Sequence, residues 1–70
     1  MKLTDLKLGQ EGIVLRVPLL RLHELGLIPN TKVKIISKGP FGNPIEIAFC
    51  GNHLLIDRKT AMEIEAMPCD

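Results

Sequence analysis

Three residues have side chains that could hold a transition metal. Cys50 and His53 stand at C-x-x-H spacing around an expected hairpin, and Cys69 lies further along the chain. Thiolate and imidazole groups suit Zn²⁺ or Fe²⁺. A structural zinc site normally has four ligands, however, and one C-x-x-H pair supplies two. The pattern therefore favours a half-buried cysteine beside a solvated histidine, and a metal-binding or metal-sensing domain is the alternative that it leaves open.

The residue combinations of common enzyme sites are missing from the sequence. No glycine-rich loop is followed by Lys and then Ser or Thr, so the chain is not itself a P-loop GTPase. Ser37, the only serine, lies among lysines, and neither His23 nor His53 belongs to an evident arrangement of nucleophile and carboxylate. We predict that the protein is not an enzyme.

An expected helix that begins at Pro18 offers a better candidate for a functional surface. If Leu22 and Leu25 pack inward, Leu20 points partly outward, on the side of the helix that carries its polar residues. Exposed apolar patches of this kind mark partner-binding sites. We predict that four helical residues and one loop residue contact a partner: Leu20, Arg21, His23, Glu24 and Phe41.

Short apolar segments separated by glycine and proline must position these residues. Residues 3–9 are typical of a helical turn capped by Thr4. The helix from Pro18 should end at Gly26, followed by inward-facing Leu27 and Ile28. A tight turn is expected at residues 51–52, and Thr60 should cap one more helical turn. Alternation and β-branched residues predict strands at five segments: residues 11–17, 32–38, 45–49, 53–56 and 64–67.

Five short strands with one inserted helix predict a mainly β fold, a small closed or nearly closed barrel of antiparallel strands. Closure matters because a small open sheet would expose its edges to pairing with other chains. We expect residues 1–70 to form a single domain. The strand residues expected to face the core are Val33, Ile35, Ile45, Ile47 and Phe49.

Charge and composition exclude several classes of partner. With 9 basic and 8 acidic residues the formal net charge is +1, which gives no electrostatic reason to expect nucleic acid. Only two aromatic residues are present, Phe41 and Phe49, too few for a base-stacking platform. No apolar stretch approaches the roughly 20 residues of a membrane span. We expect a cytoplasmic protein with reduced thiols and no membrane insertion.

The segment from Arg21 to Asn30 reads R-L-H-E-L-G-L-I-P-N and resembles the R-L-x-E-L-G-L-x-P-G signature of the FeoA family. Gly9 and Gly12, the strand at residues 32–38 and the ending Gly51…Arg58…Ala61…Ile64 follow in the family's order. Three positions depart from the family pattern: Leu20 and Asp57 stand where a basic residue is usual, and Asn30 replaces the turn glycine. Asn tolerates the same left-handed backbone.

The resemblance implies an SH3-like barrel with the helix inserted between early strands. It also implies a role in bacterial ferrous iron transport, beside the FeoB-type transporter and its GTP-hydrolysing cytoplasmic part. The expected function is therefore that of a non-enzymatic protein that docks on this part and regulates or assembles it. Pairing with a second copy of the chain is the other interaction left open.

Overall fold

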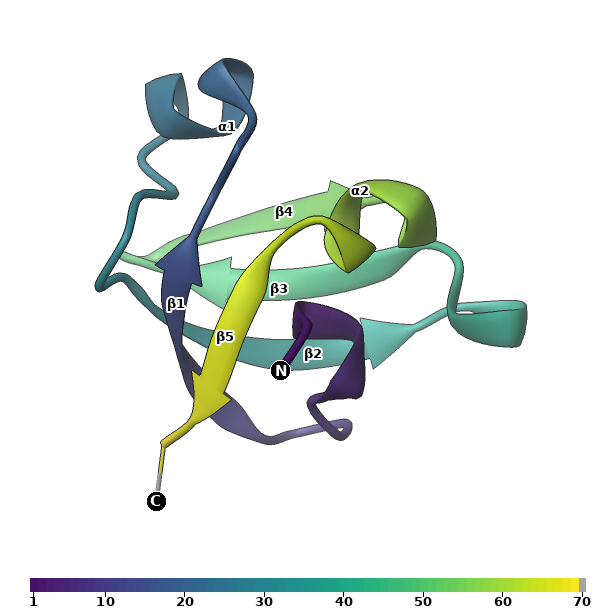
Figure 1. Ribbon diagram of the computed structural model, residues 1–70. Helices are drawn as coiled ribbons and strands as arrows, with labels where there is room; N and C mark the ends of the chain where they lie inside the picture. Colours follow the sequence, from purple (N-terminus) through teal and green to yellow (C-terminus); the bar gives the residue numbers. More distant parts are fainter. Residues whose placement is uncertain (70) are drawn as a thin grey trace.

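The computed structural model describes residues 1–69, which form one antiparallel sheet of five strands and several short helices (Figure 1). The prediction of a mainly β fold with one helix between the first two strands is confirmed. No helix within residues 1–69 is long and apolar enough to cross a bilayer. The elements in chain order are η1 (Leu3–Asp5), β1 (Glu11–Arg16), α1 (Leu20–Glu24), β2 (Lys32–Lys38), η2 (Pro40–Gly42), β3 (Ile45–Phe49), β4 (Asn52–Ile56), α2 (Arg58–Met62) and β5 (Glu65–Pro68).

The sheet bends so that its two halves enclose a core. The strands pair in the order β4-β3-β2-β1-β5, and Figure 1 shows β1 and β5 crossing the other three strands steeply. The pairing register shifts between Ile35 and Ser37 and between Val14 and Arg16, and such bulges let a strand turn sharply. The five strand residues expected to face the core are all buried, together with Leu3, Leu6, Val14, Val17, Leu22, Leu27, Ile56, Ala61, Ile64 and Ala66.

Helix α1 ends where the sequence predicts but starts later. Gly26 has φ of 98°, its N–H donates to the His23 carbonyl, and the Leu27 N–H donates to the Leu22 carbonyl. These two bonds form a Schellman motif, in which a left-handed glycine stops the helix. The expected start at Pro18 is wrong. The extended backbone of Leu19 leaves that proline outside the helix.

One expected turn is displaced in the structure, and another is found where it was expected. The tight turn between β3 and β4 consists of Cys50 and Gly51 instead of residues 51–52, because Phe49 pairs with Asn52. Both turn residues have positive φ, 50° and 78°, as a type I′ turn requires. The left-handed conformation expected at Asn30 is confirmed by its φ of 76°.

The short helices at the two ends of the chain also differ from expectation. Helix α2 follows Asp57, and Thr60 lies buried within it instead of capping it. The first turn is η1, which is preceded by Lys2 and includes Thr4. The Lys2 N–H donates to the Asp5 carboxylate at 2.9 Å, so Asp5 stabilises this turn and Thr4 does not cap it.

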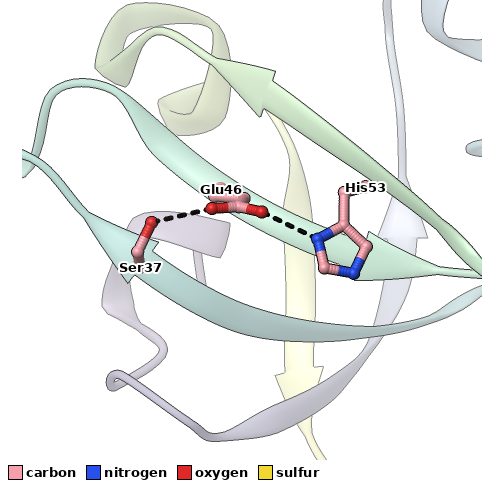
Figure 2. A network of polar contacts seen from close by, with 3 residues as sticks. All are labelled: Ser37, Glu46 and His53. Carbon is pink, nitrogen blue, oxygen red and sulfur yellow. Dashed lines mark hydrogen bonds and ion pairs between the residues drawn. The ribbon is translucent and has the colours of Figure 1, made fainter.

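A polar network on the outer face joins three neighbouring strands (Figure 2). His53 Nδ1 on β4 donates to one carboxylate oxygen of Glu46 on β3 at 2.7 Å. The Ser37 hydroxyl on β2 donates to the other oxygen at 3.1 Å. These bonds, first from His53 and then from Ser37, hold the pKa of Glu46 below its ordinary value of 4.5.

The lowered pKa of Glu46 predicts a pH-dependent contribution to stability. Because the folded-state pKa lies below that of the unfolded chain, the contribution is present above pH 4.5 and is lost as pH falls through the folded value. We expect the wild type to melt above Glu46→Gln at pH 7, and the difference to shrink at pH 3. Thermal unfolding followed by circular dichroism checks this. A difference that stays constant with pH would contradict the prediction.

Gly12 leaves room for β5 and for Leu6, the residue after η1, to pack against β1. A Cβ at this position would lie 2.7 Å from Leu6 Cδ1 and 2.8 Å from the Met67 carbonyl oxygen. We expect Gly12→Ala to lower the free energy of unfolding by about 1–3 kcal/mol, the usual cost of overpacking. Urea denaturation measures it. In a Leu6→Ala background the added cost should be smaller, and an equal cost in both backgrounds would show that the contact with Leu6 is not responsible.

Candidate functional site

The surface of α1 exposes leucines. Leu20 is 76% exposed, as predicted, and Leu22 is buried. Leu25, expected inside, is 55% exposed, because the Schellman motif turns the chain at this point and carries Leu27 into the core instead. Ile28 was also expected inside but is exposed. The helix therefore presents a larger apolar surface than its spacing predicts.

His23, one of the predicted contact residues, already forms a hydrogen bond within the chain. Its Nε2 donates to the Val17 carbonyl, since a carbonyl can only accept. This bond ties the middle of α1 to the segment that leads into it from β1. Only Nδ1 of the ring is left for another partner. His23 therefore helps to position the helix, and its ring is half-buried.

Arg21 reaches from α1 to the start of α2. Its Nη2 lies 3.5 Å from the Thr60 hydroxyl, within reach of a long hydrogen bond. Hydrogen bonding from Thr60 is the main cause that lowers the pKa of Asp57, and the positive charge of Arg21 adds to it. Asp57 is therefore a carboxylate at neutral pH. Its presence in place of the family's usual basic residue gives Arg21 an acidic neighbour.

Two adjoining grooves separate α1 from β4. One, of about 250 Å³, is lined by Arg21, Leu22, Leu25 and the β4 end from Leu54 to Asp57. The other, of about 380 Å³, is lined by Glu24, Leu25, Phe49 and the β4 start from Asn52 to Leu54. Leu25 and Leu54 belong to both, so the depression runs along the whole length of β4. Its centre is apolar and its ends are polar.

Phe41 does not join the α1 surface. It lies in η2, at the far end of β2 from α1 (Figure 1). Its side chain is 94% exposed and its φ is 58°, an unusual value for an aromatic residue. The loop is held in place by a bond from the Gly39 N–H to the Pro44 carbonyl and by one from the Arg58 N–H to the Asn43 side chain. Four of the five predicted contact residues therefore share one helix, and the fifth stands apart.

The three candidate metal ligands do not form a cluster. Across residues 1–69, no three His, Cys, Asp or Glu side chains lie close enough to hold an ion. Cys50 borders a hollow with Lys32, Lys34 and Ala48. His53 is on edge strand β4 and turns toward Glu46, whereas Cys69 follows β5 at the opposite edge of the sheet.

Leu25, Leu54 and Leu55 are among the groove-lining residues that the sequence-based contact site left out. Alternation in a strand places Leu55 on the opposite face from Leu54 and Ile56, and Leu55 is indeed 64% exposed. That signal was present in the sequence. The sequence does not say, however, that β4 is an edge strand facing α1, because this depends on the order of strands in the sheet.

Solved structures with the same fold are FeoA proteins. The FeoA protein from Chlorobium tepidum is 33% identical to this chain, with a TM-score of 0.92. The match covers all of this chain and 71% of the Chlorobium tepidum protein. Stenotrophomonas maltophilia FeoA, solved in complex with zinc and described as an SH3 domain protein, is 25% identical over 96% of this chain and 89% of its own, with a TM-score of 0.82. An FeoA-like protein from Clostridium acetobutylicum, 22% identical, matches in fold with a TM-score of 0.85 over 97% and 85% of the two chains.

These likenesses confirm the SH3-like architecture expected from the strand pattern and the signature. No curated protein sequence matches the chain. The model of the FeoA domain matches residues 1–68, which is nearly the whole sequence. Together with the fold and the 33% identity to a solved relative, this match shows that the chain belongs to the FeoA family, which is associated with ferrous iron transport.

Proposed function

We propose that this chain is a non-enzymatic accessory protein that docks on the cytoplasmic, GTP-hydrolysing part of an FeoB-type ferrous iron transporter and regulates or assembles it. Family membership supports the link to iron transport. Stenotrophomonas maltophilia FeoA is described as a candidate activating factor of bacterial ferrous iron transport. The observation that carries docking is the exposure of Leu20 on α1 and of Leu25, which caps the end of α1, beside a groove that follows β4.

The docking surface that we propose consists of Leu20, Arg21, Glu24 and Leu25, held in place by His23. Two exposed leucines on one short helix supply apolar area, and the flanking charges set orientation. Burying an exposed leucine stabilises a complex by about 1.5–3 kcal/mol. Phe41 offers a second contact, which only a partner extending to the opposite end of the molecule could reach at the same time.

Leu20→Glu tests the docking surface. A charge in place of this leucine should weaken binding to the cytoplasmic region of the transporter encoded in the same genome by at least about tenfold, since a buried carboxylate is costly. Biolayer interferometry measures the affinity. Leu8→Glu is the matched control, because Leu8 is 65% exposed, precedes β1 and does not line the grooves beside α1.

GTP hydrolysis by the transporter region, measured with and without each variant, separates regulation from assembly. A change in rate caused by the wild type and lost with Leu20→Glu supports regulation. Binding without a change in rate supports assembly. Equal affinities for Leu20→Glu and Leu8→Glu would show that α1 is not the contact surface.

A second candidate function is the binding of a transition metal. Two observations favour it: Glu46 holds His53 by Nδ1, which leaves Nε2 free, and a relative was solved in complex with zinc. A carboxylate that orients a histidine in this way is the usual outer partner of a zinc ligand. Cys50 in the adjoining turn is the nearest candidate for a second ligand along the chain. With few protein ligands, such a site would bind weakly.

Calorimetric titration with Zn²⁺ tests this candidate. We expect His53→Ala to abolish binding, Glu46→Gln to weaken it and Cys69→Ser to leave it unchanged, because Cys69 is at the opposite edge of the sheet. Binding should weaken as pH falls, since the imidazole must be neutral to coordinate. No binding tighter than millimolar, or binding that survives His53→Ala, would rule out a site at His53.

A further inference from the structure

The two edges of the sheet differ in how they are covered. The edge strand β5 is met by the start of the chain: Lys2 forms an isolated bridge with Glu65, and the Ala66 N–H donates to the Met1 carbonyl at 2.8 Å. The other edge strand, β4, has β3 on one side only. Its sequence, N-H-L-L-I, contains no lysine and no proline, the residues that commonly protect an open edge.

The register of the hairpin shows which backbone groups face outward from β4. Across a two-residue turn the closing residues, Phe49 and Asn52, form a hydrogen-bonded pair. Pairs then alternate along the ladder, so Leu54 and Ile56 also bond to β3. The N–H and C=O groups of His53 and Leu55 consequently point to the open side. These two N–H donors and two C=O acceptors have the spacing that pairing with the backbone of an additional strand requires.

The grooves beside α1 lie along this open side. Their lining includes every residue from Asn52 to Asp57, and both grooves are lined by Leu54 and by Leu25, which caps the end of α1. A strand laid along β4 would place alternate side chains against these two leucines. Its other side chains would lie on the outer face, near His53 and Glu46 (Figure 2). Unpaired backbone groups and an apolar groove thus lie side by side, as in proteins that bind a peptide by strand addition.

Charged residues around the grooves indicate which kind of segment would bind there. Glu24 lies at one end, Asp57 at the other, and Glu46 borders the outer face. Arg21 is the one arginine or lysine in the groove lining, and it is already close to Thr60 and Asp57. The groove lining therefore has two carboxylates, Glu24 and Asp57, against one arginine, and it complements a segment with flanking lysines or arginines.

We propose that β4 is the docking edge for an extended segment of the transporter's cytoplasmic part, apolar at alternate positions and flanked by basic residues, which adds a sixth strand to the sheet. This inference rests on the proposed docking function and names its mode. A second copy of this chain fits less well. Its own β4, the strand that would pair with this edge, has the sequence N-H-L-L-I and carries no lysine or arginine to meet Glu24 and Asp57.

A pair of variants at one position isolates the backbone contact. Leu55→Pro removes an outward N–H that the fold does not use, and Leu55→Ala shortens the side chain but keeps that N–H. We expect Leu55→Pro to weaken binding to the transporter's cytoplasmic region at least about tenfold more than Leu55→Ala. Circular dichroism of the free variants confirms that they fold. In the wild-type complex, the amides of His53 and Leu55 should exchange with deuterium more slowly than in the free protein.

The outcomes separate this inference from the docking function itself. If the wild type binds and Leu20→Glu does not, but Leu55→Pro binds as well as Leu55→Ala, docking stands and strand addition is overturned. Unchanged exchange at His53 and Leu55 in the complex overturns it as well, even if Leu55→Pro misfolds. Slow exchange of these amides in the free chain, with a dimer by light scattering, assigns the edge to a second copy. No binding by the wild type removes both proposals.

Discussion

The bend in the sheet is the constraint on which the rest of the structure depends. A chain of 70 residues has too few segments to cover a flat sheet with helices, so it must bury one face of the sheet against itself. The register shifts near Ile36 and Leu15 allow β1 and β5 to cross the other strands. The core then lies between the two halves, with Leu3, Leu6, Leu22, Leu27 and Ile64 closing it from outside the strands.

This way of closing the core also determines which strand edge and which side chains stay exposed and available for binding. The sheet bends without joining its ends, so β4 and β5 remain edges, and only β5 is met by the start of the chain. Helix α1 contributes Leu22 to the core and leaves Leu20 and Leu25 exposed. A helix of five residues cannot hide apolar side chains all around its axis. The exposed leucines and the open strand consequently occur side by side.

The bulge in β2 shows how a small departure from regular pairing makes a polar site. Strict alternation would turn Ser37 inward with Val33 and Ile35. The register shift instead sets Ser37 opposite Glu46 on the outer face, where its hydroxyl completes the network that reaches His53. The periodicity of the sequence could not predict this network. A bulge is chosen by the packing of the whole core, and its effect on side-chain direction appears only once that packing exists.

Local patterns in the sequence determined the five strands, the glycine that ends α1, the left-handed Asn30 and the core residues of β2 and β3, because each depends on neighbours a few positions away. The predicted start of α1 and the predicted turn between β3 and β4 were off by one or two residues. Leu25 and Ile28 were wrongly expected to be buried. Tertiary structure alone decided that Phe41 is remote from α1, that His23 and Arg21 have partners within the chain, and that β4 is an open edge beside a groove. The physical reason is that those features depend on contacts between segments far apart in the sequence, which periodicity and spacing do not record.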